Sequence, residues 1–564
     1  MFLRTTLAVL GAAVLHAAAH ASDLAAAPPA APPAVPERID ADAWDARAAE
    51  HLLNRAGFGA GSLEVERLVA SGPEAAVASL FAPQRFVDPY FLALDETLRE
   101  ARERARERMD AGEATIEELR DMRRRMRLDF RRRDRQQMTT YTTWWLQRMV
   151  DGDDPLRDRM TLFWTGLFTS SYREVKSSRA MIEQHQLLRG GALGSYADLL
   201  RGIARDPAML EYLDAASNKK SSPNENFARE LLELFSLGEG HYTEADVVAA
   251  ARAFTGWTNR RGETVFNRRQ HDGGEKSFMG VTGRLDGEDV IEIVLAQDRC
   301  AEYVAGRLLE YFEGRVPSET RVRHYASILR ASDYEVRPVL EELFLDREFY
   351  SDEVVGQRIA APVDLLVGQV RRLGIDPPVA LLAAGAASVG QTLFGPPSVK
   401  GWDEGRAWIT TTTIMQRGNL SGVLVGTVGS QEFLESSDLD DALEAPMMDG
   451  DGPALTERRG RGDDVVRLLG RIEDLGWRPT MHLSARAARL GARDDAGVVD
   501  AFASELLGVA LSERSRAELV AFLREERAAT SLPEDCWTTF DSEVEYLARR
   551  LAHLMLSMPE GQLH

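Results

Sequence analysis

The segment from His271 to Lys276, HDGGEK, combines side chains that can act together in acid–base chemistry. His271 stands next to Asp272, and an imidazole beside a carboxylate can serve as a general base near neutral pH. The glycine pair that follows permits a tight turn and the close approach of a ligand. We predict catalytic roles for His271 and Asp272 and a ligand-binding role for the positively charged Lys276. The same residue types also build hairpin turns, so a purely structural turn stays open.

A second polar group opens the run SPNENFARELLELFSLG, which begins at Ser222. Ser222 and Glu225 have the S-x-x-E spacing of a helix capping box, and the residues after them present one apolar face at helical spacing. Capping does not explain Asn226, Arg229 and Glu230, which border that face. We predict Glu230 as a catalytic carboxylate and Asn226 and Arg229 as ligand-binding residues. Hydrogen bonds to neighbouring loops are the structural alternative.

A second helix start follows at Thr243, with Asp246 three residues on. Val247, Ala250 and Phe254 fall on the apolar face of this second helix, so we predict a helix–loop–helix unit.

Aromatic side chains mark a third candidate. The Pro- and Gly-rich loop of residues 391–408 holds Trp402 and Trp408 beside acidic and basic side chains. A flat ring offers apolar area at low entropic cost, and rings beside acids often line saccharide or peptide sites. We predict that Trp402 binds a ligand. The alternative is that both rings fix the loop to the core, because tryptophan is usually largely buried.

His51 and Arg55 lie one helical turn apart near the start of the folded region. Arginine binds carboxylate and phosphate groups bidentately, so we predict that this pair binds an anionic ligand. In the alternative, Arg55 pairs with an internal carboxylate and His51 caps a helix or packs.

Several reaction types lack their sequence signals. The chain has no G-x-S-x-G nucleophile elbow, no P-loop, no dinucleotide fingerprint, and no H-E-x-x-H or C-x-x-C pattern. We therefore expect no cofactor and no bound metal. Carboxylates for glycoside hydrolysis are present, but the sequence does not give their separation.

The composition is that of a large globular protein. The 564 residues are 44% hydrophobic and 28% charged, which is enough for more than one domain. A formal net charge of −21 argues against nucleic-acid binding, since phosphate contacts need a basic surface. Cys300 and Cys536 are the only cysteines, and whether they form a disulfide stays open.

Residues 1–21 predict a cleaved export signal. Arg4 precedes a short apolar run, and Ala19-His20-Ala21 has the small-x-small form that signal peptidase cuts. A helix that spans a bilayer needs about 20 apolar residues, and this run is shorter, so we expect no transmembrane helix in the mature protein. We expect an exported protein, periplasmic or at the cell surface, with an Ala/Pro-rich linker over residues 22–44.

Helical patterns dominate the remaining sequence, including a charge-dense stretch from Glu96 to Met149. We predict a predominantly α fold, with a large multi-helix domain over residues 45–435 and a small β-hairpin between Thr264 and Met279. An acidic, Gly-rich linker or loop over residues 436–465 then precedes a helical C-terminal part. That part, residues 466–564, packs on the main domain or continues it.

Several segments taken together resemble the large bacterial family DUF1800, a domain of unknown function. The matching segments are HLLNRAGFG (residues 51–59), FWTGLFTSS (163–171), IARDPAMLEYLD (203–214), PNENFARELLELFSLG (223–238), HDGGEKSFMG (271–280), PVDLLVG (362–368), LFGPPSVKGWDEGRAWI (393–409) and RGNL (417–420). The resemblance implies an exported, mainly α-helical protein, often encoded beside a DUF1501 protein, and it supplies no established reaction. On this basis we add Arg417 to the predicted ligand-binding residues and a DUF1501-type protein to the predicted partners.

The chain departs from the family pattern at one place. Family members commonly read FWHxHF where this chain reads FWTGLF, so Thr165 and Leu167 stand at the two histidine positions. If that pair binds metal in relatives, this chain lacks both ligands.

Together these patterns lead us to expect a polar cleft for a polysaccharide or peptide ligand. In one form of this hypothesis the protein is a hydrolase that acts on a cell-envelope or extracellular polymer. In the alternative it is a non-catalytic binding or assembly factor that works with a DUF1501-type partner.

Overall fold

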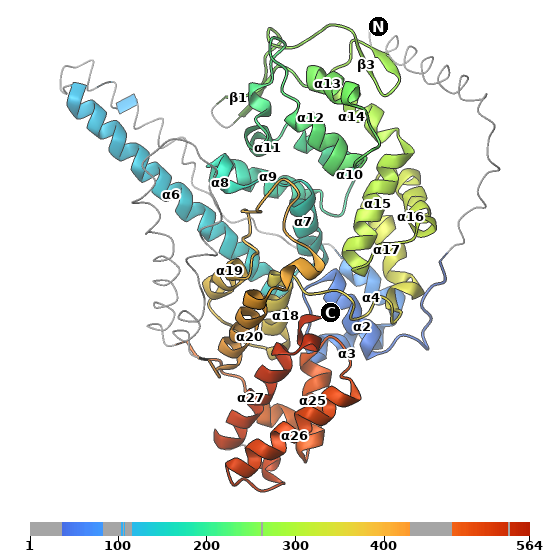
Figure 1. The fold of residues 1–564 in the computed structure, drawn as a ribbon, viewed down its shortest axis with the longest axis vertical. Coiled ribbons are helices and arrows are strands. Elements are labelled where there is room, and N and C mark those ends of the chain that lie inside the picture. Colours follow the sequence, from blue (N-terminus) through green and yellow to red (C-terminus); the bar gives the residue numbers. More distant parts are fainter. Residues whose placement is uncertain are drawn as a thin grey trace.

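The computed structural model describes residues 36–82, 103–104, 107, 116–260, 263–428, 477–539 and 542–564. Within these ranges the protein is predominantly α-helical, as the sequence predicts, and its strands form two small two-stranded sheets (Figure 1). The predicted export signal, residues 22–35 of the predicted linker and the acidic segment of residues 436–465 lie outside the described residues.

The first part of the chain forms helices that surround the middle of the molecule (Figure 1). They are α2 (Ala46–Ala56), α3 (Ser62–Ser71), α4 (Pro73–Leu80), α6 (Ile116–Asp151), α7 (Pro155–Leu167), α8 (Tyr172–Val175), α9 (Ser178–Gly190), α10 (Tyr196–Ile203), α11 (Pro207–Tyr212) and the 3-10 turn η2 (Ala215–Ser217). Helix α6 changes character along its length. Its Arg-rich first half is largely exposed, whereas Tyr141, Trp145 and Met149 in its second half are buried.

The run that begins at Ser222 forms two helices, as predicted, but its first cap differs from the prediction. Helix α12 (Asn226–Glu230) continues into the π-helical turn η3 (Leu231–Ser236), and α13 (Glu244–Ala253) follows. The expected Ser222–Glu225 capping box is absent from α12, whose N-cap makes no side-chain hydrogen bond. Asparagines order this turn instead, because Asn218 accepts from the Asn224 N–H at 3.0 Å and Asn224 from the Asn226 N–H at 2.9 Å.

The second cap of this unit agrees with the sequence. Thr243 and Asp246 form a reciprocal capping box at the start of α13. The predicted apolar face of the helix, which includes Val247, Ala250 and Phe254, is buried in the core.

Two hairpins follow where the sequence predicts one. Strand β1 (Trp257–Arg260) pairs with β2 (Glu263–Phe266), and β3 (Lys276–Phe278) pairs with β4 (Val281–Gly283), both antiparallel. The segments TVF and KSF therefore do not pair with each other. Each finds a partner across a short turn of its own, and this costs less loop-closure entropy than bridging the nine-residue polar segment between them.

The next set of helices begins beside α10 and α13 and extends down to α2 (Figure 1). These are α14 (Gly287–Leu295), α15 (Asp298–Glu313), α16 (Glu319–Ala331), α17 (Val336–Leu345) and the 3-10 turn η4 (Arg347–Tyr350). Helix α15 ends at Gly314, whose φ of 74° is the left-handed conformation that glycine adopts most readily.

The remaining helices form the lower part of the molecule in Figure 1. They are α18 (Pro362–Leu373), α19 (Val379–Ser388), the 3-10 turn η5 (Gly405–Trp408), α20 (Thr411–Val425), α24 (Leu483–Arg489), α25 (Asp495–Leu506), α26 (Glu513–Ala529), η6 (Cys536–Thr538), α27 (Ser542–Ser557) and η7 (Pro559–Gln562). Helix α27 packs on α20, and α25 packs on α18. The C-terminal helices therefore contact the main domain directly.

Two hydrophobic cores hold these elements together. One joins α2, α7 and α10 to α15–α17, and the other joins α6, α18–α20 and the C-terminal helices. Cys300 lies in the first core and Cys536 in the second, both as thiols without a disulfide within the described part of the chain. None of the described helices is long and apolar enough to cross a membrane.

Candidate functional site

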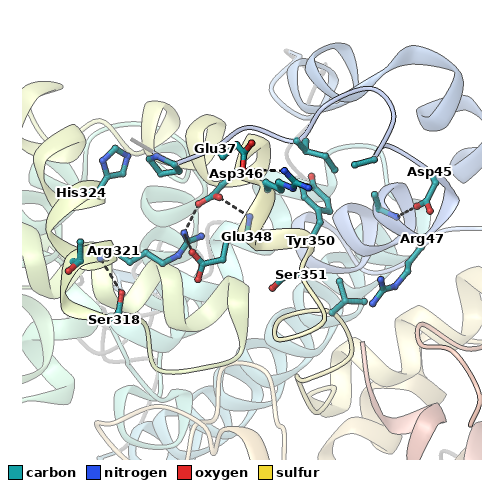
Figure 2. A pocket seen from close by; sticks show the side chains of 17 residues that line it. Glu37, Asp45, Arg47, Ser318, Arg321, His324, Asp346, Glu348, Tyr350 and Ser351 are labelled. Atoms are coloured by element: carbon teal, nitrogen blue, oxygen red, sulfur yellow. Dashed lines mark hydrogen bonds and ion pairs between the residues drawn. The ribbon is translucent and has the colours of Figure 1, made fainter. Parts of the chain in front are cut away.

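The larger of two prominent cavities, about 660 Å³, lies between the chain before α2 and the segment around α16 and η4 (Figure 2). We call it the N-terminal cavity. Arginines at this cavity form ion pairs with neighbouring carboxylates. Arg47 lies 2.6 Å from Asp352, and Arg347 lies 3.2 Å from Glu37.

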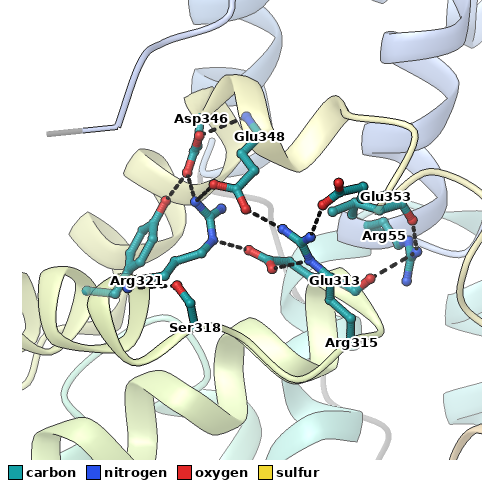
Figure 3. Close-up of polar contacts among 10 residues, drawn as sticks. Arg55, Glu313, Arg315, Ser318, Arg321, Asp346, Glu348 and Glu353 are labelled. Atoms are coloured by element: carbon teal, nitrogen blue, oxygen red, sulfur yellow. Dashed lines mark hydrogen bonds and ion pairs between the residues drawn. The ribbon is translucent and has the colours of Figure 1, made fainter. Parts of the chain in front are cut away.

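An ion-pair network holds one wall of the N-terminal cavity in place (Figure 3). Arg321 donates from Nε to Glu313 at 2.7 Å and from Nη1 to Glu348 at 3.1 Å, and Nη1 also lies 2.6 Å from Asp346. Nη2 of Arg321 makes no hydrogen bond to the described residues, yet three carboxylates compensate the charge of this guanidinium. The network joins α15, α16 and η4, and we interpret it as structural.

The second cavity, about 550 Å³, collects side chains from distant parts of the sequence. We call it the Trp402 cleft. Its walls come from α7, the end of α15, residues 353–361, the start of α18 and the loop of residues 391–408. Three of the segments that carry the DUF1800 resemblance, FWTGLFTSS, PVDLLVG and LFGPPSVKGWDEGRAWI, therefore meet here.

The loop that carries Trp402 is fixed tightly against α7. Gly401 has a φ of 90°, and a Cβ on it would lie 2.7 Å from the carbonyl oxygen of Gly166, so only glycine fits there without a shift. The indole N–H of Trp402 donates to the Thr392 carbonyl oxygen at 3.0 Å. The ring of Trp402 is half-buried, whereas Trp408 is almost fully buried. The prediction that the rings fix the loop thus describes Trp408 best, while Trp402 keeps an accessible face on the cleft.

The rim of the cleft carries both signs of charge. Arg307 lies 3.0 Å from both Glu310 and Glu404, so a single arginine pairs with both carboxylates. Lys400 and Arg406 also line the cleft, and they are exposed. Neither of these two makes a side-chain ion pair or hydrogen bond within the described ranges.

The floor of the cleft is built on Asp364, a fully buried carboxylate at the start of α18. Arg159 donates from Nη1 to Oδ1 of Asp364 at 2.5 Å, and it also donates to the backbone oxygens of Asn54 and Gly57. On the other side, Nη2 of Arg358 lies 3.3 Å from Oδ2 of Asp364, with its guanidinium 4.7 Å from the centre of the Tyr311 ring. Asp364 therefore holds two arginines at once.

Further positive charge lies directly behind this floor. Arg55 is fully buried and donates to the carbonyl oxygens of Val354 at 2.9 Å and Glu313 at 3.5 Å. Burial lowers the pKa of Arg55 well below its ordinary value, and the charges of Arg358 and Arg159 add to this effect. Burial likewise lowers the pKa of Arg417 to about 10.

The HDGGEK segment lies outside the lining of the Trp402 cleft, and its polar groups make local contacts. Nδ1 of His271 lies 2.9 Å from the Thr255 carbonyl oxygen. Asp272 accepts from Nε of Arg252 at 2.7 Å, and this bond holds the pKa of the carboxyl below its ordinary value. Lys276 is buried, and its Nζ donates to the carbonyl oxygens of Asp272, Gly274 and Leu285 at 2.5, 3.0 and 2.9 Å.

The polar edge of α12 likewise lies outside the cleft lining. Arg229 donates to both oxygens of Glu244 at 2.8 Å, and Asn226 is exposed. Glu230 is half-buried, and burial together with the charge of Glu233 raises its pKa. The positive charge of Lys400 at the cleft rim opposes that shift. Glu230 therefore interacts electrostatically with the rim of the cleft.

His51 and Arg55 lie one turn apart on α2, both are buried, and neither lines the Trp402 cleft. The His51 ring packs on Phe349 with ring centres 4.6 Å apart, and burial lowers its pKa well below the ordinary value. Arg417 is also buried, where it donates to Gln562 at 2.7 Å and to the Ala360 carbonyl oxygen at 2.6 Å.

Trp402, which the sequence singled out, lines this cleft, whereas Arg159, Arg358 and Asp364 were not singled out. The signal for Asp364 and Arg159 is a charge inside an apolar run, as in PVDLLVG and RDRMTLFW. Such a charge is buried only when it is paired, so it marks a polar contact inside the core. Nothing local distinguishes Arg358 from other arginines, since its partner is brought to it by the fold.

Comparison with known families identifies the chain. The model of the family described as "Protein of unknown function (DUF1800)" matches residues 51–563. The chain belongs to the DUF1800 family. No match to a curated protein or to a solved structure was found.

In this DUF1800 protein, the family match spans both the main helical region and the C-terminal helices. The two positions at which relatives commonly have histidine differ in their surroundings. Leu167 lines the Trp402 cleft, whereas Thr165 is buried and its hydroxyl donates to the Thr161 carbonyl oxygen at 2.7 Å. Among the described residues, no group of three or more His, Cys, Asp or Glu side chains is arranged to hold a metal ion.

Proposed function

We propose that this DUF1800 protein is exported and that its Trp402 cleft binds a segment of a cell-envelope or extracellular polymer, with a saccharide as the unit held. The observation that carries the proposal is the convergence of five distant chain stretches on one cavity that joins an accessible indole face to charged side chains. Ligand sites combine apolar walls with a few convergent polar groups in this way.

Trp402 supports a saccharide as the bound unit. Its ring has a face on the cleft, and its N–H bond to Thr392 fixes the orientation of that face. A rigid indole gives contact area to a flat apolar sugar face at little entropic cost. Lys400 and Arg406 at the rim remain available to a polar ligand.

Binding without catalysis is the form of the proposal that the cleft favours. Glu310 and Glu404 both pair with Arg307, and Glu353 lies 2.8 Å from Arg315. A carboxylate engaged by arginine is a weak base, because the ion pair stabilises its charged form. A DUF1501-type protein remains the proposed partner for such a binding or assembly factor.

Hydrolysis is a second candidate, and one observation favours it. The pKa of Glu230 is raised by burial and by Glu233, and a carboxyl with a raised pKa can donate a proton to a leaving group. Replacing Glu230 with Gln in a protein that cleaves a polymer would abolish cleavage and leave binding intact. Cleavage that survives this change would exclude Glu230 as the acid.

Export is supported by the N-terminal sequence alone. Mass spectrometry of the mature protein from its host is expected to find an N-terminus at Ser22. A cytoplasmic product that begins at Met1 would contradict export.

The binding proposal is tested by calorimetric titration of cellohexaose and hexagalacturonate, a neutral and an acidic polymer segment. Trp402→Ala is expected to weaken binding of the segment about tenfold or more. Trp477→Ala is the matched control, because Trp477 is also half-buried and its indole N–H also donates to a backbone oxygen, that of Asp376, at 3.0 Å. Loss of binding in both variants, or in neither, would contradict a site at Trp402.

A further inference from the structure

The floor of the Trp402 cleft holds more buried positive charge than the side chains around it neutralise. Arg159 and Arg358 share the single carboxylate of Asp364, and the fully buried Arg55 lies behind them. The nearby Glu313 does not correct the balance, because Arg321 and Arg315 already engage its two oxygens at 2.7 and 3.3 Å. Buried charges in proteins are normally paired, so an excess of this kind needs an external partner.

Hydrogen-bond donors on this floor are also left without acceptors. Nη1 of Arg358 and both Nε and Nη1 of Arg55 are buried and find no partner in the described ranges of the chain. An unsatisfied buried donor costs free energy, and charged donors cost the most. Oδ2 of Asp364 makes no hydrogen bond either, although it lies 3.3 Å from Nη2 of Arg358. The floor therefore carries donors that its own carboxylate does not satisfy, and fewer negative than positive side chains.

The arginines are reached from the cleft at Gly314. This residue lines the cleft, and a Cβ placed on it would lie 2.7 Å from Cβ of Arg358 and 3.2 Å from Nη1 of Arg55. Arg358 itself lines the cleft and keeps 14% of its side chain exposed. The absence of a side chain at Gly314 thus leaves the guanidinium group of Arg55 and the aliphatic stem of Arg358 close to the cavity surface.

We propose that the floor of the Trp402 cleft is an oxyanion subsite, in which Arg358, backed by Arg55, binds a carboxylate or phosphate group carried by the ligand. This inference rests on the proposed function and narrows its ligand class to acidic polymers. An oxyanion supplies both missing components, since its oxygens accept from several guanidinium N–H groups and its charge offsets the excess. Trp402 then packs on the sugar ring, while Arg358 binds the acidic group that the sugar carries.

If Arg358 binds a ligand, its replacement should affect the melting temperature differently than the replacement of a purely structural arginine would. Arg358→Gln removes one of the mutually repelling charges, and Asp364 keeps its bond to Arg159. Without ligand, the melting temperature of the Arg358→Gln protein is therefore expected to equal or exceed that of the native protein. A clear fall in melting temperature would mean that Arg358 only holds the fold together, and would overturn the proposal.

The binding test compares hexagalacturonate, its fully methyl-esterified form and inorganic phosphate, on the full chain. We expect the acid to bind the native protein about tenfold or more tightly than the ester, and Arg358→Gln to abolish this difference. Arg514→Gln is the control for overall charge, because Arg514 is 87% exposed on α26, and it is expected to bind as the native protein does. Equal affinity of the native protein for acid and ester, with no stabilisation by phosphate, would overturn the oxyanion subsite.

The arms of this experiment separate the two proposals and the two sources of the anion. If the ester binds in a Trp402-dependent manner and the acid binds no more tightly than the ester, the polymer-binding cleft is supported and the oxyanion subsite is refuted. If phosphate raises the melting temperature of the native protein but not of Arg358→Gln, and neither sugar binds, the oxyanion subsite is supported with free phosphate as its ligand. That outcome would refute the polymer as the ligand. Absence of binding by all three probes would overturn both.

Discussion

The region from Asn218 to Asp286 and the floor of the Trp402 cleft are both rich in charged side chains, yet the two regions satisfy them differently. In the first, Lys276 meets three backbone oxygens and Asp272 meets Arg252. In the second, Arg358 and Arg55 keep donors without acceptors among the described residues. Among the described residues, the first region has no buried side-chain polar atom without a partner, whereas the second has three such donors on Arg55 and Arg358.

This difference shows what a dense polar motif in a sequence can and cannot indicate. HDGGEK is conspicuous because its types and spacing also suit a turn that satisfies its own backbone. The cleft floor is inconspicuous in sequence, because its arginines come from segments about 100 to 300 residues apart. We infer that unsatisfied buried groups mark the ligand site better than local crowding does.

The largest expected effect concerns Arg159, the arginine of the floor that is fully paired. Arg159→Met leaves Asp364 and the Gly57 carbonyl oxygen without their main donor, so we expect a loss of about 3–5 kcal/mol in unfolding free energy. Urea denaturation measures it. A loss as small as that for Arg358→Gln would mean that the two arginines play equal parts, contrary to their different hydrogen bonding.

Lys276 provides the corresponding test in the other region. Lys276→Met retains the length of the side chain but leaves three carbonyl oxygens without their donor, and we expect the protein to lose about 2–4 kcal/mol of unfolding free energy. Ligand binding at the Trp402 cleft should not change, which calorimetry at a temperature where the variant is folded would show. Weakened binding with unchanged stability would instead make Lys276 a ligand-binding residue, as the sequence suggested.

The Arg252–Asp272 pair predicts a small pH-dependent effect. Because the pKa of Asp272 is lowered in the folded protein, its stabilising contribution is present above the unfolded pKa and is lost as the pH falls through the folded pKa. Asp272→Asn is expected to cost less than about 1 kcal/mol at pH 7, because the pair is partly exposed. In matched denaturation curves the difference from the native protein should shrink as the pH falls below the unfolded pKa of about 4 and vanish once the pH lies below the folded pKa. A difference that persists there would mean that Asp272 acts through its shape rather than its charge.

The smallest effect is expected at Arg229, whose partners are on the surface. Arg229→Ala removes exposed ion pairs with Glu244 and Glu225, which contribute little to stability because solvent screens them. Thermal denaturation and sugar titration should both match the native protein. A tenfold loss of affinity would place Arg229 in the binding site and weaken the contrast between the two regions.

The sequence predicts the helical fold well, because amphipathic spacing and caps act locally. The capping box at Thr243 and the apolar face of α13 are examples. It predicts pairing less well, since the TVF and KSF strands each take a partner outside the expected hairpin.

The candidate site could be predicted only where one residue carries its own signal. An indole in a Pro/Gly loop is such a signal, so Trp402 was found. Arg55 was singled out for an anion with His51, which lies one turn away on α2, but the His51 ring packs on Phe349 while Arg55 lies close to Arg358. A site assembled from α7, α15, α18 and two loops requires tertiary structure that no local pattern contains.

Hydrogen–deuterium exchange of the native protein with and without hexagalacturonate tests the central claim most directly, because one measurement reports on both regions. When hexagalacturonate binds, we expect slower amide exchange in the segments that line the Trp402 cleft, residues 307–316, 353–361 and 391–408. Exchange in residues 218–286 should not change. Protection confined to residues 218–286, with the cleft segments unaffected, would contradict the account.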